Sequence, residues 1–208
     1  MKILVLGTRG VGLQVIKLGL LYGHKIRAFS RRPGTLSIAD ENFEMFHGDA
    51  ANSADIEAAA EGMDIIVSAI GIPPAKNDVS IFSVSAGHLV SAVKKNNVKL
   101  LIMVTGIGAG DSMGHGGFIY DKIIFPLLLS KVYEDKNRAE AILSKSDINW
   151  IIVRPGFLTN GKLTEKYRVI THLDGIKCGG ISRADTAHFI LTQAASRTYI
   201  KQTPLITY

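Results

Sequence analysis

Short apolar runs alternate with longer amphipathic runs along most of this chain of 208 residues. The apolar runs are rich in Ile, Val and Leu, as buried parallel strands are. The runs between them place apolar residues three and four positions apart, which is typical of helices. We therefore expect strands at residues 2–7, 25–30, 43–49, 64–71, 99–106 and 149–156. We expect helices at residues 11–22, 53–61, 79–96 and 131–146.

The regular alternation predicts a single α/β domain of the Rossmann class, a doubly wound parallel sheet with helices on both faces. Ser53 is the expected N-cap of its helix. The pattern is looser after Gly156, so we expect a core at residues 1–156 and a small C-terminal lobe at 157–208. In this lobe we expect a strand at 167–173, a helix at 182–196 that begins near Ser182 or Asp185, and a final edge strand at 204–208.

The net charge of +6 originates in the first part of the chain. Residues 1–39 contain no Asp or Glu, while the rest of the chain is close to neutral. The basic residues of this part are Lys2, Arg9, Lys17, Lys25, Arg27, Arg31 and Arg32. A positive field confined to one unit favours a local anionic ligand over an extended nucleic-acid surface.

Composition limits the cellular setting. Hydrophobic residues make up 47% of the chain, enough to bury a large core. The single cysteine, Cys178, excludes an internal disulfide framework and fits a reducing cytosol. The most apolar run, residues 118–132, is interrupted by charges and Pro126 and is too short to span a bilayer. No stretch has the form of a signal peptide, so we expect a cytoplasmic protein without a membrane span.

Three glycines lie between the first expected strand and the first expected helix, in the stretch VLGTRGVGLQVIK. Gly7, Gly10 and Gly12 at this spacing could simply turn the chain. In the first strand-to-helix turn of an α/β chain, however, glycines let the backbone approach a pyrophosphate, whose charge then meets the helix N-terminus. The position therefore favours a dinucleotide phosphate site over a bare turn.

The second strand ends in Ser30, Arg31 and Arg32, with no carboxylate nearby. Enzymes that use NAD place Asp or Glu here, whereas arginine accommodates the 2′-phosphate of NADP. A guanidinium can hold a phosphate through two hydrogen bonds. Arg9, inside the glycine loop, is a further candidate for this phosphate. The alternative is that these arginines are solvated surface residues, but their placement favours NADPH as the cofactor.

Five stretches carry a family resemblance: VLGTRGVGLQVIK, RAFSRRP, FHGDAANSADIEAAAEGMDIIVSAIG, WIIVRPGFLTNG and ISRADTAHFI. Together they resemble the atypical short-chain dehydrogenase/reductase superfamily. Within it they are most similar to the NAD(P)H-binding group that includes biliverdin reductase B, also called flavin reductase. The nitrogen-repressor-like NADP sensors are neighbours of this group. The resemblance covers nearly the full length of the chain.

The resemblance implies roles for residues at the ends of the strands. It places Gly7, Thr8, Gly10, Val11 and Gly12 at the pyrophosphate, Arg31 and Arg32 at the 2′-phosphate, Asp49 and Ala50 beside the adenine, Ala69, Ile70 and Gly71 along the cofactor, Thr105 and Gly106 beside the nicotinamide, and Pro155, Gly156 and Phe157 at the carboxamide. Lys136 resembles the lysine that holds the nicotinamide ribose in many relatives. It is equally consistent with a surface lysine on a charged helix. Thr105 and Lys136 are therefore the candidate catalytic residues.

Two features depart from the family pattern. The family usually has G-x-x-G-x-x-G, whereas this loop is one residue shorter before Gly12. The Tyr-x-x-x-Lys pair of the superfamily is also absent, because Tyr133 and Lys136 are three residues apart. We expect this spacing to keep the two side chains off the usual shared face. Biliverdin reductase B relatives also lack that pair.

Other patterns point to chemistry that we do not expect here. The stretch GDSMG matches the hydrolase motif G-x-S-x-G, but GIGAG separates Ser112 from the preceding strand, where a nucleophile needs a tight turn. The six histidines show no ligand spacing, so no metal site is expected. Residues 118–130 occupy the place of a mobile lid in relatives, and plain core or a dimer surface is the alternative.

Taken with the resemblance, these patterns predict an NADPH-dependent reductase. Its expected partner is a planar conjugated hydride acceptor, such as a flavin, a linear tetrapyrrole or a quinone, and not a nucleic acid. The cofactor would carry the chemistry, while the protein orients it and excludes water. A non-enzymatic NADP(H) sensor is the alternative, and the missing Tyr-x-x-x-Lys disfavours a sugar-nucleotide epimerase. Either a monomer or a homodimer is compatible with the sequence.

Overall fold

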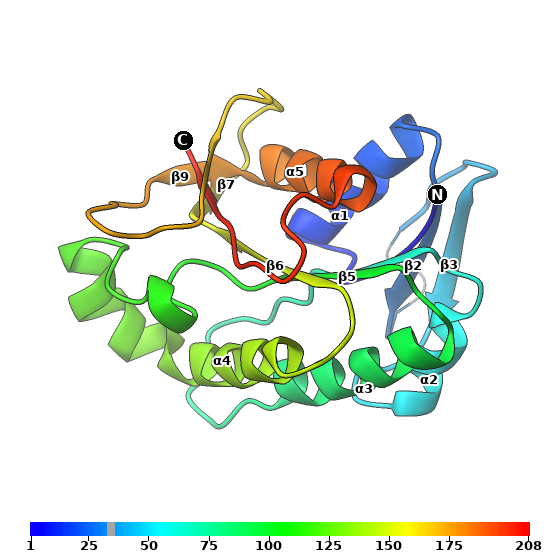
Figure 1. Ribbon diagram of the computed structural model, residues 1–208, viewed down its shortest axis with the longest axis horizontal. Coiled ribbons are helices and arrows are strands. Elements are labelled where there is room, and N and C mark those ends of the chain that lie inside the picture. Colours follow the sequence, from blue (N-terminus) through cyan, green and yellow to red (C-terminus); the bar gives the residue numbers. More distant parts are fainter. Residues whose placement is uncertain (33–35) are drawn as a thin grey trace.

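An eight-stranded sheet forms the centre of the protein, in a computed structural model that describes residues 1–32 and 36–208 (Figure 1). The strand order is β3-β2-β1-β4-β5-β6-β10-β8, and a separate two-stranded sheet pairs β7 with β9. The strands are β1 (Lys2–Leu6), β2 (Lys25–Ser30), β3 (Phe43–His47), β4 (Ile65–Ser68), β5 (Leu100–Val104), β6 (Trp150–Pro155), β7 (Phe157–Thr159), β8 (Arg168–Ile170), β9 (Gly180–Ser182) and β10 (Leu205–Thr207). The order of β3 to β6 is that of a doubly wound fold, which confirms the expected fold class.

Helices cover both faces of the central sheet (Figure 1). α1 and α5 pack together on one face, and α2, α3 and α4 form a row on the other. The helices are α1 (Gly10–Leu21), α2 (Ser53–Ala60), α3 (Ile81–Lys95), the 3₁₀ turn η2 (Gly110–Ser112), the π-helix η3 (Tyr120–Leu129), α4 (Ser130–Ser144) and α5 (Arg183–Ser196). No helix in residues 1–32 and 36–208 combines the length and the apolar character needed to cross a membrane.

The central strands are apolar throughout because both of their faces are buried. In β1, Leu4 and Leu6 join the core under α2, α3 and α4, while Ile3 and Val5 join the core under α1 and α5. Successive side chains of a strand point to opposite faces, so a strand between two helical layers shows no polar alternation. This explains why the apolar runs of the sequence mark the central strands directly.

The start of α2 differs from expectation. Asn52, not Ser53, is the N-cap, and its side-chain oxygen accepts a hydrogen bond of 2.9 Å from the Ala54 N–H. The backbone of Asn52 is extended, while Ser53 is already the first helical residue. Both residue types cap helices well, so only the backbone conformation decides between neighbours.

The last strand also differs from expectation. β10 lies inside the sheet, parallel to β6 and antiparallel to β8, so the prediction of an edge strand at 204–208 is wrong. All three residues of β10 are buried. The three-residue β8 takes the edge instead, where it satisfies the outer hydrogen-bonding groups of β10.

Residues 157–208 contribute to both the central layers and the separate sheet. α5 packs on α1, and β8 and β10 extend the main sheet, whereas β7 and β9 pair apart from it. Ser182 caps α5, as expected, by accepting a hydrogen bond of 2.9 Å from the Asp185 N–H. The segment is therefore tied to the core through its helix and its last strand.

Candidate functional site

The expected site residues gather at one edge of the sheet, where the parallel strands end. In chain order, residues 7–12 follow β1, 49–50 follow β3, 69–71 follow β4 and 105–106 follow β5. Residue 30 ends β2 and 31–32 come directly after it, while residue 155 ends β6 and 157 begins β7. The strand order reverses between β1 and β4. In open α/β sheets, ligands bind in the crevice at such a reversal.

The three glycines of the first loop have different surroundings. A β-carbon on Gly7 would lie 2.4 Å from the Ala69 carbonyl oxygen, and one on Gly12 would lie 1.8 Å from the Gly7 carbonyl oxygen. Among the described residues outside its own loop and helix, a β-carbon on Gly10 would meet only the side chain of Arg183 within 4 Å. Gly7 therefore permits the turn, and Gly12 permits the helix to pack closely on the strand. Gly10 keeps one side of the loop open. Glycines have these three tasks in a dinucleotide-binding loop.

The N-terminus of α1 meets the requirements for an anion site. Arg9 is the N-cap residue, and its side chain makes no capping hydrogen bond. The first turn of the helix holds no acidic residue. Thr8 and Val11 are buried beneath the loop, whereas Arg9 and Gly10 are exposed. Free N–H groups and the positive end of the helix dipole thus face the crevice beside an open glycine, an arrangement that fits a phosphate group.

The residues predicted to contact the adenosine lie at the ends of β2 and β3. Arg31 and Arg32 are exposed at the end of β2, and the Arg32 N–H donates a hydrogen bond of 3.2 Å to Ser30 Oγ. Asp49 accepts a hydrogen bond of 3.0 Å from the Ala51 N–H, which shapes the turn after β3. Ala50 is buried in this turn. The two arginines therefore lie one strand away from the glycine loop, and their contact with a 2′-phosphate stays a prediction.

An ionic network with a buried Arg154–Glu140 pair lies at the same edge of the sheet, beside β5 and β6. Arg154 on β6 donates to Glu140 on α4 through Nη2 (2.6 Å) and Nε (3.2 Å), and it also contacts Asp111. Thr105 Oγ donates a hydrogen bond of 2.6 Å to the same Glu140 carboxylate. Burial disfavours the charge of Arg154, but Glu140 and Asp111 outweigh it and raise the pKa of Arg154. The network fixes Thr105 against β6 and α4.

Lys136 lies beside this network. Its ammonium donates to the Thr105 carbonyl oxygen and stands 4.6 Å from the centre of the Tyr133 ring. Burial lowers the pKa of Lys136 to about 8, although the charge of Glu140 acts in the opposite direction. Residues three apart on a helix are neighbours, so the expectation that Tyr133 and Lys136 do not share a face is wrong. The structure thus brings both candidate catalytic residues together after β5.

Four aromatic rings pack on one another beside the chain that follows β5 and β6. Ring centres are separated by 4.9 Å between Tyr120 and Phe157 and by 5.1 Å between Phe125 and Tyr133. Tyr120 and Phe125 also meet edge to face at 6.0 Å. We call these four residues the aromatic cluster. The Tyr133 hydroxyl would lie 2.7 Å from a β-carbon on Gly106, so the cluster borders the predicted nicotinamide residues directly.

The π-helix η3 covers the aromatic cluster with Phe125 and turns other apolar residues outward. We call residues 118–130 the apolar segment. Its exposed apolar side chains are Phe118, Ile119, Ile123, Ile124, Leu127 and Leu128. Plain core is therefore the wrong interpretation of the segment as a whole. A lid or a surface between two copies of the chain stays a prediction.

The hydrolase-like motif has no reactive serine. Ser112 is fully buried, donates a hydrogen bond of 2.6 Å to the Ala109 carbonyl and accepts one of 3.0 Å from the Gly108 N–H. Its hydroxyl therefore stabilises a turn. Among the described residues, no group of three or more His, Cys, Asp and Glu side chains is arranged to hold a metal ion.

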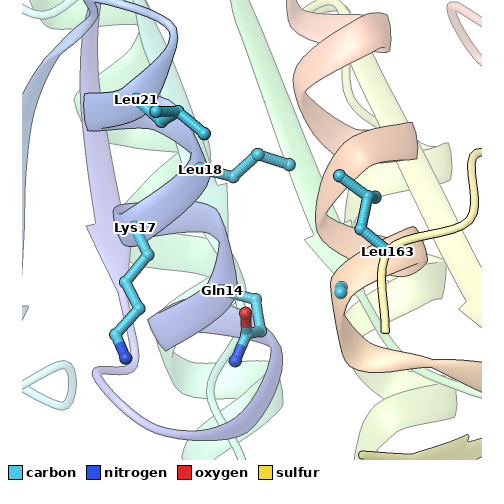
Figure 2. A pocket seen from close by; sticks show the side chains of 6 residues that line it. Gln14, Lys17, Leu18, Leu21 and Leu163 are labelled. Carbon is cyan, nitrogen blue, oxygen red and sulfur yellow. The ribbon is translucent and has the colours of Figure 1, made fainter. Parts of the chain in front are cut away.

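A small hollow of about 150 Å³ lies apart from these residues, between α1 and the chain before α5. It is lined by Gln14, Lys17, Leu18, Leu21, Leu163 and Ala184. Figure 2 shows Leu18 and Leu163 extending toward one another across it. None of the predicted cofactor residues lines this hollow, so we do not include it in the site.

Sequence reasoning missed the ionic network and the aromatic cluster. Glu140 belongs to the charged helix α4, where a glutamate attracts no notice. Arg154 belongs to the apolar strand β6, and a charged residue inside a buried strand was the one sequence signal of a buried ion pair. Tyr120 and Phe125 lie in the π-helix, whose widened turn has no periodic signature in the sequence. Both features depend on contacts between distant segments.

Comparison with known proteins identifies the class. A profile of the NAD(P)H-binding family matches residues 7–197. The fold resembles ChuY, an anaerobillin reductase of Escherichia coli O157:H7, with 24% identity over 100% of this chain and 97% of that chain and a TM-score of 0.81. It also resembles a short-chain dehydrogenase/reductase of Veillonella parvula in complex with NADP, with 18% identity over 100% of this chain and 94% of that chain and a TM-score of 0.82.

A third structure, an oxidoreductase of Lactococcus lactis, has 22% identity over 100% of this chain and 90% of that chain and a TM-score of 0.83. At these identities the three structures establish the Rossmann fold. The family match covers most of the chain, so the protein belongs to the NAD(P)H-binding family. This match confirms the NAD(P)H-binding family that the five sequence stretches indicated.

Two glycine substitutions distinguish a loss of fold stability from a loss of NADPH binding. We expect Gly12→Ala to lower the free energy of unfolding by about 1–3 kcal/mol or more, because its β-carbon collides with the Gly7 carbonyl. Gly10→Ala should cost only about 1–2 kcal/mol, for the positive φ of 54°, yet weaken NADPH binding strongly. Denaturant unfolding and a fluorescence titration with NADPH measure the two effects. A Gly10→Ala protein that binds NADPH as tightly as the parent would place the phosphate cradle elsewhere.

Two buried hydroxyls provide a matched pair after β5. Thr105→Val and Ser112→Ala should each lower the free energy of unfolding by about 1–3 kcal/mol, because each leaves a buried partner unsatisfied. Only Thr105→Val should also weaken NADPH binding, by about 0.5–1.5 kcal/mol, the value of one hydrogen bond. Calorimetric titration tests the difference. Equal affinities in both variants would remove Thr105 from the cofactor site, and labelling of Ser112 by a fluorophosphonate would contradict its burial.

Proposed function

We propose that this protein is an NADPH-dependent reductase that delivers a hydride to a planar conjugated acceptor. The observation that carries the proposal is the aromatic cluster beside Gly106, at the end of the crevice where the predicted nicotinamide residues gather. Flat aromatic faces bind flat conjugated ligands by offset or edge-to-face stacking. A flavin, a linear tetrapyrrole and a quinone all have this form.

The choice of NADPH over NADH is supported by charge. Arg31 and Arg32 are exposed at the end of β2, and residues 1–39 contain no carboxylate that would bind ribose hydroxyls instead. A guanidinium forms charge-assisted hydrogen bonds with a phosphate, and the 2′-phosphate is the group that distinguishes NADPH from NADH. Arg9, exposed in the glycine loop, adds positive charge to the same region.

Among acceptors, a linear tetrapyrrole has the most support. The fold is similar to that of an anaerobillin reductase, whose named substrate is a bilin. The exposed apolar segment next to the aromatic cluster offers a large surface of the kind that such a ligand would cover. Flavins and quinones remain in the proposal because they share the flat conjugated core.

The chain's own part in the reaction is to bind, orient and shield. When bound, NADPH supplies the hydride. Thr105 donates its hydroxyl hydrogen to Glu140, which leaves the oxygen free to accept a hydrogen bond from the carboxamide or the acceptor. Lys136 holds a proton on Nζ at neutral pH and is close enough to Thr105 to contact a ribose there. The proton that completes reduction of the acceptor comes from solvent in this scheme.

A non-enzymatic NADP(H) sensor is the second candidate. It is favoured by the engagement of both candidate catalytic side chains within the protein, Thr105 with Glu140 and Lys136 with the Thr105 carbonyl. A sensor needs the cofactor cradle but no acceptor site. The aromatic cluster favours the reductase, because an acceptor that stacks on its partly exposed members needs such a surface and a sensor does not.

Turnover assays distinguish the two functions. Purified protein is mixed with NADPH and, in separate reactions, flavin mononucleotide, biliverdin and a soluble quinone, and the loss of NADPH absorbance is followed. We expect oxidation that depends on at least one acceptor and that falls when Phe157→Ala opens the aromatic cluster. Tight binding of NADPH without oxidation by any acceptor class would support the sensor and contradict the reductase.

The arginine pair should determine cofactor preference. Arg31→Ala combined with Arg32→Ala is expected to weaken NADPH binding by roughly tenfold or more, because charge-assisted hydrogen bonds to the 2′-phosphate are worth about 1.5–3 kcal/mol. NADH binding should stay nearly unchanged. Lys25→Ala, at the other end of the same strand, is the matched control and should alter neither affinity. Equal dissociation constants of the parent for the two cofactors would refute this preference.

A further inference from the structure

Arg183 reaches from the start of α5 to two other segments. It is the first helical residue, directly after the N-cap Ser182, and its side chain is half-buried. Its Nη1 donates a hydrogen bond of 2.8 Å to the Asn160 side-chain oxygen and one of 3.3 Å to the Leu158 carbonyl. One side of the guanidinium is thereby tied to β7 and the residues that follow it.

The same guanidinium borders the open side of the glycine loop. A β-carbon on Gly10 would lie 3.5 Å from Arg183 Nε and 3.9 Å from its Cδ, and within residues 1–32 and 36–208 no other group outside the loop and α1 comes within 4 Å. Gly10 is the glycine that keeps the loop open, at the first residue of α1. Arg183 therefore stands next to the free N–H groups at the start of α1, although it lies more than 170 residues away in sequence.

The charge of Arg183 is not balanced locally. Within residues 1–32 and 36–208, its hydrogen bonds go only to an amide and a carbonyl, and no carboxylate forms an ion pair with it. The first turn of α1 has no acidic residue either. A planar guanidinium with donors left over, beside the positive end of a helix, is suited to an anion that can accept several hydrogen bonds.

We propose that Arg183 is a binding residue for the pyrophosphate of the dinucleotide. The inference rests on the proposed cofactor site and assigns to that site a contact from the C-terminal part of the chain. Because NADPH and NADH share the pyrophosphate, Arg183 contributes to the affinity for both, unlike Arg31 and Arg32. Through Asn160 and Leu158 it also links the bound phosphate to the segment after β7, next to the aromatic cluster.

Calorimetric titration with three ligands tests this role. The parent, Arg183→Met, Arg183→Lys and Arg197→Met are titrated with NADPH, NADH and ADP-ribose, which has the pyrophosphate but no nicotinamide. We expect Arg183→Met to weaken all three ligands by a similar factor of roughly tenfold to a hundredfold, the range for hydrogen bonds to charged groups. Arg183→Lys should recover part of the loss, because it keeps the charge but not the planar fork.

Arg197→Met is the matched control. It makes the same change at the exposed C-terminal end of the same helix and should leave every affinity unchanged. Thermal unfolding of the four proteins verifies that α5 stays folded, and the Arg183→Lys protein provides the test if Arg183→Met does not fold.

The outcomes separate this inference from the proposed function. Arg183→Met and Arg183→Lys proteins that bind all three ligands as the parent does would overturn the role of Arg183 and leave the cofactor site intact. Loss of NADPH affinity alone would also overturn it, because that loss would assign Arg183 to the 2′-phosphate. A parent that binds neither NADPH nor ADP-ribose would overturn the cofactor site and Arg183 together. Absence of turnover with any acceptor bears on the reductase only.

Discussion

The close approach of α1 to the ends of β1 and β4 is the constraint on which the crevice depends. No side chain fits between the Gly7 carbonyl and Gly12, or between Gly7 and the Ala69 carbonyl. About two turns further along α1, a β-carbon on Gly19 would lie 2.8 Å from the side chain of Ile26, so α1 also packs closely on β2. The helix can therefore start only at the reversal of strand order. Its N–H groups then point into the crevice, whatever occupies it.

Electrostatics, not steric fit, organises the part of the site beside β5 and β6. The Arg154–Glu140 pair ties β6 to α4, and Thr105 and Asp111 attach the chain after β5 to the same pair. Gly110 leaves the space that the guanidinium needs. Buried pairs of this kind cost desolvation and stabilise the fold only when every member is present. Here the Arg154–Glu140 pair holds β6, α4 and the chain after β5 in one fixed arrangement.

The sequence predicted the parts of this protein that local patterns determine. Apolar runs identified the central strands. The glycine loop was recognisable from its spacing between a strand and a helix, and the Ser182 cap because its partner Asp185 is close in sequence. Features that depend on distant partners were not accessible. β10 lies between strands from two other regions, Glu140 is paired with a strand residue, and Arg183 meets a loop at the opposite end of the chain. The choice of Asn52 over Ser53 depended on a single pair of backbone angles.

The absence of acidic residues from positions 1–39 has a kinetic consequence. In the fold, residues 1–32 of this part form β1, α1 and β2, and Arg9, Arg31 and Arg32 are exposed where the two strands end. A cleft lined by one sign of charge attracts oppositely charged molecules before they touch it and raises their rate of association. Mobile ions shield such a field over about 8–10 Å at physiological ionic strength. An anionic ligand would therefore reach this edge of the sheet faster in dilute buffer than in salt, while its rate of escape would change much less.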